Sequence, residues 1–120
     1  MNIMVVDDSS AMRMMIIRTL RQAGFGDKEV VQASDGAEAL EAIRKKSPDL
    51  ILADWNMPNM SGIELLKQLR EDGNQVTFGF ITTEATEPMR LKAREAGAKF
   101  LISKPFTVES FEQVLGTIMA

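Results

Sequence analysis

Three aspartates in this 120-residue sequence follow apolar segments that have the composition of buried β-strands. Asp54 comes directly after the apolar run 50–53, and Asp7 and Asp8 come directly after the apolar run 3–6. If both runs are parallel strands, the three carboxylates meet at one edge of a sheet. Unit charges ~5 Å apart repel by roughly 3 kcal/mol per pair at an effective dielectric of about 20, so such a cluster needs a counter-ion.

A divalent cation meets this need, and an all-oxygen ligand set selects a hard ion such as Mg²⁺. An incomplete protein shell leaves coordination positions for water and a phosphoryl group, so the cluster predicts a magnesium site for phosphoryl transfer. The alternative for any single aspartate is a helix cap or a loop position. Three of them, together with Thr82 and Lys104 after later apolar runs, favour the magnesium site.

The composition indicates one globular domain over residues 1–120, with 45% hydrophobic and 26% charged residues giving enough apolar surface for a core. The apolar runs are too short to span a bilayer or to form a signal peptide, so we expect a cytoplasmic protein. The sequence contains no Cys and no His, which excludes disulfides, thiolate metal sites, imidazole bases and most hydrolase triads.

The charge pattern argues against nucleic acid as a partner. The net charge is −3 and the two signs are interspersed, whereas nucleic-acid binding needs a basic stripe. The only basic run, 44–46, lies where the C-terminus of a helix favours positive charge. We therefore expect neither nucleic acid nor a membrane as a partner.

Strand-like and helix-like segments alternate five times along the chain. Strands are predicted near 2–6, 29–33, 50–53, 76–81 and 99–103, and helices from Ser9 or Ser10 to Gly24, over 37–46, from the end of the loop 55–61 to Gly73, from Pro88 to Gly97, and from Val108 to Met119. Short strands that are apolar on both faces and joined by helices indicate an α/β fold with a doubly wound parallel sheet. Ligands bind at the carboxyl ends of such strands, where the aspartates, Thr82 and Lys104 all fall.

These residues resemble the receiver domain of response regulators in two-component signalling. The match extends over essentially the whole chain, from the pair Asp7 and Asp8 to Lys104 and Pro105, and the segment 54–62 is most similar to CheY-like chemotaxis regulators. The resemblance implies a flavodoxin-like sheet of five strands in the order 2-1-3-4-5, with five helices. It also implies that Asp54 accepts a phosphoryl group from a phosphohistidine on a sensor kinase.

The resemblance assigns a metal-binding set around this phospho-acceptor. Asp7 and Asp8 bind Mg²⁺ together with Asp54, and Asp8 is preferred as a direct ligand. The backbone carbonyl of Asn56 completes the protein's share of the coordination shell.

The remaining site residues lie on later segments. The Lys104 ammonium and the Thr82 hydroxyl engage the phosphoryl oxygens, as in other phosphoryl-transfer sites. By resemblance, Pro105 follows a cis peptide bond that directs Lys104 into the site. Asn56 and Glu84 flank the site and, in the family, influence how quickly the phosphoryl group is lost.

The sequence departs from the family in its fifth strand. The family couples phosphorylation to an aromatic residue in the middle of that strand, but the corresponding position is Leu101, and the chain contains no Tyr. Phe100 is one residue away, and alternate strand residues face opposite sides of a sheet. We therefore expect altered coupling. Gly79 is unusual within a strand, and we expect a bulky side chain from a helix to pack over it.

Three functions follow from these residues. The first is a monomeric chemotaxis regulator that is phosphorylated by a CheA-like histidine kinase, controls flagellar rotation through a motor switch protein, and is served by an auxiliary phosphatase. The second is a receiver of a non-motor pathway, acting as a phosphate sink, shuttle or adaptor. The third and most remote is a Mg²⁺-dependent aspartyl-phosphate phosphatase of the haloacid dehalogenase class. That class needs an aspartate two residues after the nucleophile, where this chain has Asn56, so we expect only slow self-dephosphorylation and no enzyme activity.

Overall fold

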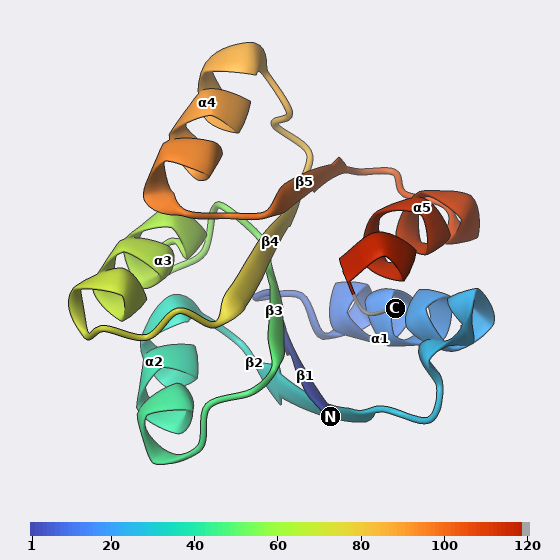
Figure 1. The fold of residues 1–120 in the computed structure, drawn as a ribbon, viewed down its shortest axis with the longest axis horizontal. Coiled ribbons are helices and arrows are strands. Elements are labelled where there is room, and N and C mark those ends of the chain that lie inside the picture. The colour runs from blue at the N-terminus through green and yellow to red at the C-terminus, as the bar shows by residue number, and fades with distance from the viewer. Residues whose placement is uncertain (119–120) are drawn as a thin grey trace.

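The computed structural model describes residues 1–118, which form a five-stranded sheet with helices on both faces (Figure 1). The strands are β1 (Asn2–Val6), β2 (Glu29–Ala33), β3 (Leu50–Ala53), β4 (Thr77–Thr82) and β5 (Phe100–Ser103). All neighbouring strands are parallel, and their order is β2-β1-β3-β4-β5. The predicted fold class and strand order are therefore confirmed.

The helices form two layers (Figure 1). One layer consists of α1 (Ser10–Leu20) and α5 (Val108–Ile118), and the other of α2 (Gly36–Lys45), α3 (Gly62–Glu71) and α4 (Glu87–Ala96). A π-helical turn, η1 (Arg21–Phe25), follows α1 and includes Gly24 at φ 100°. The end expected for the last helix, Met119, lies outside the described residues.

The alternation of side chains along the strands divides the core into two parts. In β1, Met4 and Val6 belong to the cluster under α2, α3 and α4, whereas Ile3 and Val5 belong to the cluster under α1 and α5. All four side chains are at most 2% exposed. A strand covered on both faces must be apolar at every position, which explains the uninterrupted apolar runs.

Side-chain caps fix where α1, α2, α3 and α4 begin, at the edge of the sheet that carries the three aspartates. Ser9, Asp35, Ser61 and Thr86 each accept a hydrogen bond from a backbone N–H in the first turn of the following helix. Each cap satisfies a donor that the helix itself cannot pair. The caps therefore set the lengths of the loops between the strands and the helices.

The residue that packs over Gly79 comes from a strand and not from a helix. Gly79 pairs with Phe100 of the neighbouring strand β5, and a Cβ atom at residue 79 would overlap the Phe100 ring. The expectation of a covering helix residue is therefore wrong. The physical reason is that an aromatic ring on an edge strand can lie across an adjacent strand position that has no side chain.

Within residues 1–118, no helix has both the length and the apolar character that crossing a membrane requires.

Candidate phosphoryl-transfer site

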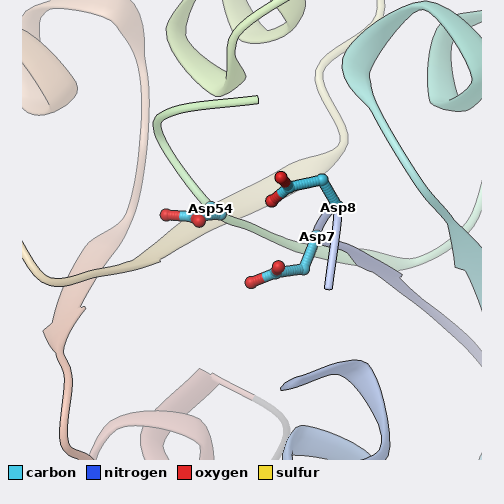
Figure 2. Close-up of side chains that lie close together, drawn as sticks. All are labelled: Asp7, Asp8 and Asp54. Atoms are coloured by element: carbon cyan, nitrogen blue, oxygen red, sulfur yellow. The ribbon is translucent and has the colours of Figure 1, made fainter. Parts of the chain in front are cut away.

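The three predicted aspartates meet at the carboxyl ends of β1 and β3 (Figure 2). Each can offer a carboxylate oxygen within 4.8 Å of those of the other two. Because β1 and β3 are paired in parallel, Val6 lies opposite Ala53, so the residues that follow these strands lie side by side. Asp7 is buried, Asp54 is partly buried and Asp8 is exposed, so the cluster is open to solvent on the side of Asp8.

Lys104 reaches this cluster from the end of the edge strand β5. Its Nζ lies 3.1 Å from Asp7 Oδ2 and 3.3 Å from Asp54 Oδ2, and its side chain is only 11% exposed. The backbone N–H of Lys104 donates to the carbonyl of Thr82, and the Lys104–Pro105 peptide is cis, as the resemblance implied. Lys104 is therefore a bridging cation between two carboxylates and not a solvated surface lysine.

The three carboxylates differ in the hydrogen bonds and ion pairs that they make with the rest of the protein. Asp7 accepts from the Ser9 N–H through Oδ1 and contacts Lys104 through Oδ2. Asp54 Oδ1 accepts from the Trp55 N–H at 2.7 Å. Among residues 1–118, no hydrogen bond or ion pair engages the Asp8 carboxylate, so Asp8 is the carboxylate most available to an added ligand.

This donor set fits a hard divalent cation. Three carboxylates within 4.8 Å of one another and one bridging ammonium leave an excess of negative charge, and the ammonium contacts Asp7 and Asp54 but not Asp8. Oxygen ligands in an incomplete shell are the preferred environment of Mg²⁺ in phosphoryl-transfer proteins. The acidic cluster is therefore suited to Mg²⁺.

Burial dominates the electrostatics of Asp54. Loss of solvent raises the pKa of the Asp54 carboxyl, the Lys104 charge opposes the shift, and the Asp7 charge adds to it. A carboxylate whose negative charge is poorly solvated gains from attaching to an electrophile. This environment suits a nucleophilic role for Asp54, which, unlike the more buried Asp7, keeps part of its side chain exposed.

The loop between β3 and α3 is held in place by contacts at Gly62 and at Asn59. Close to Asp54, Gly62 allows the helix to approach, since a Cβ atom there would overlap the Asp54 carbonyl. Farther along, Asn59 adopts φ 65° and donates from Nδ2 to Asp35 Oδ2 at 2.8 Å. The first turns of α2 and α3 therefore position the loop that follows the phospho-acceptor.

Asn56 and Glu84 lie together at the exposed edge of the site. Asn56 Nδ2 donates to Glu84 Oε1 at 2.8 Å and so joins the loop after β3 to the loop after β4. The structure thus brings together the two residues that the resemblance placed around the phospho-acceptor.

Thr82 is the last residue of β4, not the first residue after it, and it is buried. Its hydroxyl oxygen accepts from the Glu84 N–H at 3.3 Å. The hydroxyl therefore contacts the β4–α4 loop in this conformation, and within residues 1–118 it makes no hydrogen bond to Asp54.

Leu101 and Phe100 lie on opposite faces of the sheet. Leu101 packs partly buried against the cluster under α2, α3 and α4, whereas Phe100 packs against the cluster under α1 and α5. Phe100 therefore cannot substitute for an aromatic residue at position 101, as the strand alternation predicts.

Two arginines, Arg13 beside the site and Arg90 on α4, have contacts that the sequence did not indicate. Arg13 Nη1 donates to the Asp7 carbonyl, and Arg90 Nη1 donates to the Leu101 carbonyl. Arginines on amphipathic helices are commonly solvated, and their spacing says nothing about backbone carbonyls on other segments. The only signal was their position, one in the helix after Asp8 and the other in the helix before β5.

Comparison with known proteins places the chain in a family. The model of the response regulator receiver domain matches residues 3–115, so the chain belongs to the response regulator receiver domain family. It is a CheY-like receiver domain, consistent with a phospho-acceptor of two-component signalling.

Similar proteins and structures agree with this assignment. The chain is 40% identical to the chemotaxis protein CheY1 of Helicobacter pylori, covering 98% of both chains, and 38% identical to the chemotaxis protein CheY-3 of Vibrio cholerae, covering 98% of this chain and 91% of that one. The structure of chemotaxis protein CheY4 of Vibrio cholerae superimposes with a TM-score of 0.85 at 34% identity, covering 98% of this chain and 97% of that chain.

Proposed function

We propose that this chain is a single-domain response regulator over residues 1–120, phosphorylated on Asp54 by a CheA-like histidine kinase. The observation that supports this best is the position of the Lys104 ammonium, which contacts both Asp7 and Asp54 while Asp8 remains available to a cation. One ammonium cannot balance three carboxylates that lie within 4.8 Å of one another, so the cluster retains negative charge for a cation to neutralise.

The proposed step is the transfer of a phosphoryl group between two side chains. An Asp54 carboxylate oxygen attacks phosphorus, an O–P bond forms, and the P–N bond of the donor phosphohistidine breaks. Mg²⁺ held by Asp7, Asp8, Asp54 and the carbonyl of Asn56 would neutralise charge on the phosphoryl oxygens when bound. Lys104 adds a positive charge from the end of β5.

Thr82 provides the link between phosphorylation and movement in this proposal. Among the described residues, the hydrogen bond of its hydroxyl is with the Glu84 N–H in the β4–α4 loop. Rotation toward phosphoryl oxygens on Asp54 would release that N–H and draw the loop toward the site. The signal would therefore leave the site through the segment between β4 and α4.

The lifetime of the phosphorylated state is proposed to depend on Asn56 and Glu84. An amide at position 56 cannot take a proton from attacking water, so the acyl phosphate should hydrolyse slowly and the protein should not turn over phosphomonoesters. The Asn56–Glu84 hydrogen bond at 2.8 Å narrows the exposed approach to Asp54. A partner phosphatase would need to displace this pair.

The proposed output surface is formed by α4, β5 and α5. Leu101 lies between two hollows of about 220 and 210 Å³, and Arg90 lines both. Arg90, Arg94 and Lys99 line the first of these hollows and make no salt bridge within residues 1–118, so the hollow itself presents positive charge, although α4 and α5 also carry Glu87, Glu95, Glu109 and Glu112. These charges favour an acidic segment of a flagellar motor switch protein as the partner.

A non-motor output remains the second candidate because of Leu101. A leucine has no hydroxyl and no ring with which to reproduce an aromatic switch, and Arg90 is already bonded to its carbonyl at 3.3 Å. A phosphate sink, shuttle or adaptor would not require that switch. The two candidates share the chemistry of Asp54 and differ only in the partner.

Trp55 fluorescence provides the first test. Trp55 follows Asp54, and its ring lies 4.7 Å from that of Phe80, so changes at the site should alter its emission. We expect a response to Mg²⁺ and then to beryllofluoride or acetyl phosphate, and no phosphoryl response in Asp54→Ala. Absence of both responses in the wild type would contradict the proposed function.

A binding assay then separates the two candidates. Beryllofluoride-activated protein is titrated with a peptide from the motor switch protein, and Arg90→Ala serves as the output-surface variant. Activation-dependent binding that is weakened in Arg90→Ala would support the motor function. Absence of binding by an activated protein would favour the non-motor pathway.

A further inference from the structure

Arg13 ties the loop after β1 to the edge strand β2. From α1, its Nη1 donates to the Asp7 backbone carbonyl at 2.6 Å, and its Nε donates to Gln32 Oε1 at 2.9 Å. Both donors belong to one planar guanidinium, so the hydrogen bond to Gln32 also fixes the direction of the hydrogen bond to Asp7. Neither residue has a role in the phosphoryl-transfer chemistry described above.

The carbonyl that Arg13 contacts belongs to the peptide unit that joins Asp7 to Asp8. Asp7 is fixed at other points as well, because its N–H donates to the Ala33 carbonyl and its Oδ1 accepts from the Ser9 N–H. The Asp8 carboxylate, by contrast, has no hydrogen-bond partner within residues 1–118. The direction of the Asp8 side chain therefore depends on the orientation of this peptide unit.

We propose that Arg13, held in place by Gln32, is a positioning residue that orients Asp8 toward the divalent cation. This inference rests on the proposed function of the acidic cluster. Arg13 does not touch the cation or the phosphoryl group; it acts through the Asp7–Asp8 peptide unit. Partners in the shell outside the ligands commonly fix ligand orientation in this way.

The electrostatic effect of Arg13 has the opposite sign, which makes the inference testable. A positive charge close to a cation site repels the cation, so removal of the charge alone should strengthen Mg²⁺ binding. Removal of a positioning contact should weaken it. The direction of the change in affinity in Arg13→Ala therefore distinguishes the two effects.

The experiment is a Mg²⁺ titration of the intact chain, followed by Trp55 fluorescence, in conditions where each variant is folded. We expect Arg13→Ala to raise the Kd for Mg²⁺ about tenfold. Arg13→Lys should also raise the Kd, because a single ammonium keeps the charge but not the two-edged geometry. The matched control is Arg18→Ala on the same helix, where the exposed arginine should be replaceable without effect.

Gln32 provides a second, milder perturbation. Gln32→Ala leaves every charge in place and should raise the Kd by a smaller factor. The double variant Arg13→Ala/Gln32→Ala should bind no more weakly than Arg13→Ala, because Gln32 acts only through Arg13. Additive losses would overturn the coupling between the two residues.

The outcomes separate this inference from the proposed function. A wild type that fails to bind Mg²⁺ overturns the proposed function and the inference with it. A wild type that binds while Arg13→Ala binds equally well or more tightly overturns the inference alone. Urea denaturation in EDTA accompanies each titration, because a purely structural role would lower the free energy of unfolding without changing the Kd of the folded protein.

Discussion

The buried negative charge of Asp54 should destabilise the unliganded protein. The variant Asp54→Asn should therefore be more stable than the wild type in EDTA at neutral pH. The Asp54 side chain is only 15% exposed, and the penalty for burying such an ion is several kcal/mol. Asparagine has nearly the same shape but carries no charge. The substitution therefore removes a buried charge without creating a cavity.

The magnitude follows from the distances around Asp54. At an effective dielectric of about 20, Lys104 at 3.3 Å attracts the carboxylate by about 5 kcal/mol, and Asp7 within 4.8 Å repels it by at least about 3.5 kcal/mol. Asp8 lies within the same distance but is exposed, so water screens most of its repulsion and it contributes little to this balance. The Lys104 attraction and the Asp7 repulsion nearly cancel and leave about 1.5 kcal/mol of attraction against a desolvation cost of about 3 kcal/mol. We expect Asp54→Asn to gain about 1 to 2 kcal/mol.

The gain should depend on pH in a defined direction. Because burial raises the pKa of Asp54 in the folded state, the folded protein holds this proton more tightly than the unfolded chain does. The resulting stability is present below the unfolded pKa and is lost as the pH rises through the folded pKa. The advantage of Asp54→Asn should therefore be full at neutral pH and should disappear in acid.

Urea denaturation in EDTA between acid and neutral pH measures this difference. The matched control is Asp27→Asn, which removes the same charge from an exposed position and should change the free energy of unfolding by less than about 0.5 kcal/mol. Mg²⁺ should stabilise the wild type more than Asp54→Asn, because a ligand stabilises the state that binds it. The reasoning is refuted if Asp54→Asn is no more stable than the wild type at neutral pH without metal.

Three further predictions concern the loops and the sheet. Gly79→Ala should lower the free energy of unfolding in urea by about 1 to 3 kcal/mol, because the new methyl group meets the Phe100 ring. In a Phe100→Leu background the loss should be smaller, and equal losses in both backgrounds would contradict this contact. Asn56→Arg should lengthen the lifetime of the phosphorylated state several-fold, because the larger side chain obstructs the attacking water. The lifetime is measured as recovery of Trp55 fluorescence after removal of acetyl phosphate, and an unchanged lifetime would count against the position of Asn56 beside Asp54. Asp35→Ala should cost about 1 kcal/mol through loss of the α2 cap. Because the Glu38 backbone hydrogen bond lowers the pKa of Asp35, that cost should shrink as the pH falls through the folded pKa, and a cost independent of pH would exclude the carboxylate as its source.

Much of the architecture could be predicted from local sequence patterns. The apolar runs that became β1 and β3 lie within a residue of their predicted bounds, because strands covered on both faces have to be apolar throughout. Asp7 and Asp54 could be placed together because parallel strands end at a common edge of the sheet.

The resemblance to receiver domains supplied what these patterns could not. The strand order and the cis peptide before Pro105 were implied by resemblance to a family, and the structure agrees with both. Neither follows from hydrophobic periodicity, which describes one element at a time.

The sequence by itself determined the elements and the residues at their ends, whereas only the tertiary structure decided what those residues touch. Lys104 lies 97 residues from Asp7, and no local pattern specifies that its ammonium lies between Asp7 and Asp54. The Arg13 contact with the Asp7 carbonyl and the Phe100 ring over Gly79 are of the same kind. Periodicity and capping are set by near neighbours in the chain, but the end point of a long side chain depends on which strands and helices become neighbours in space.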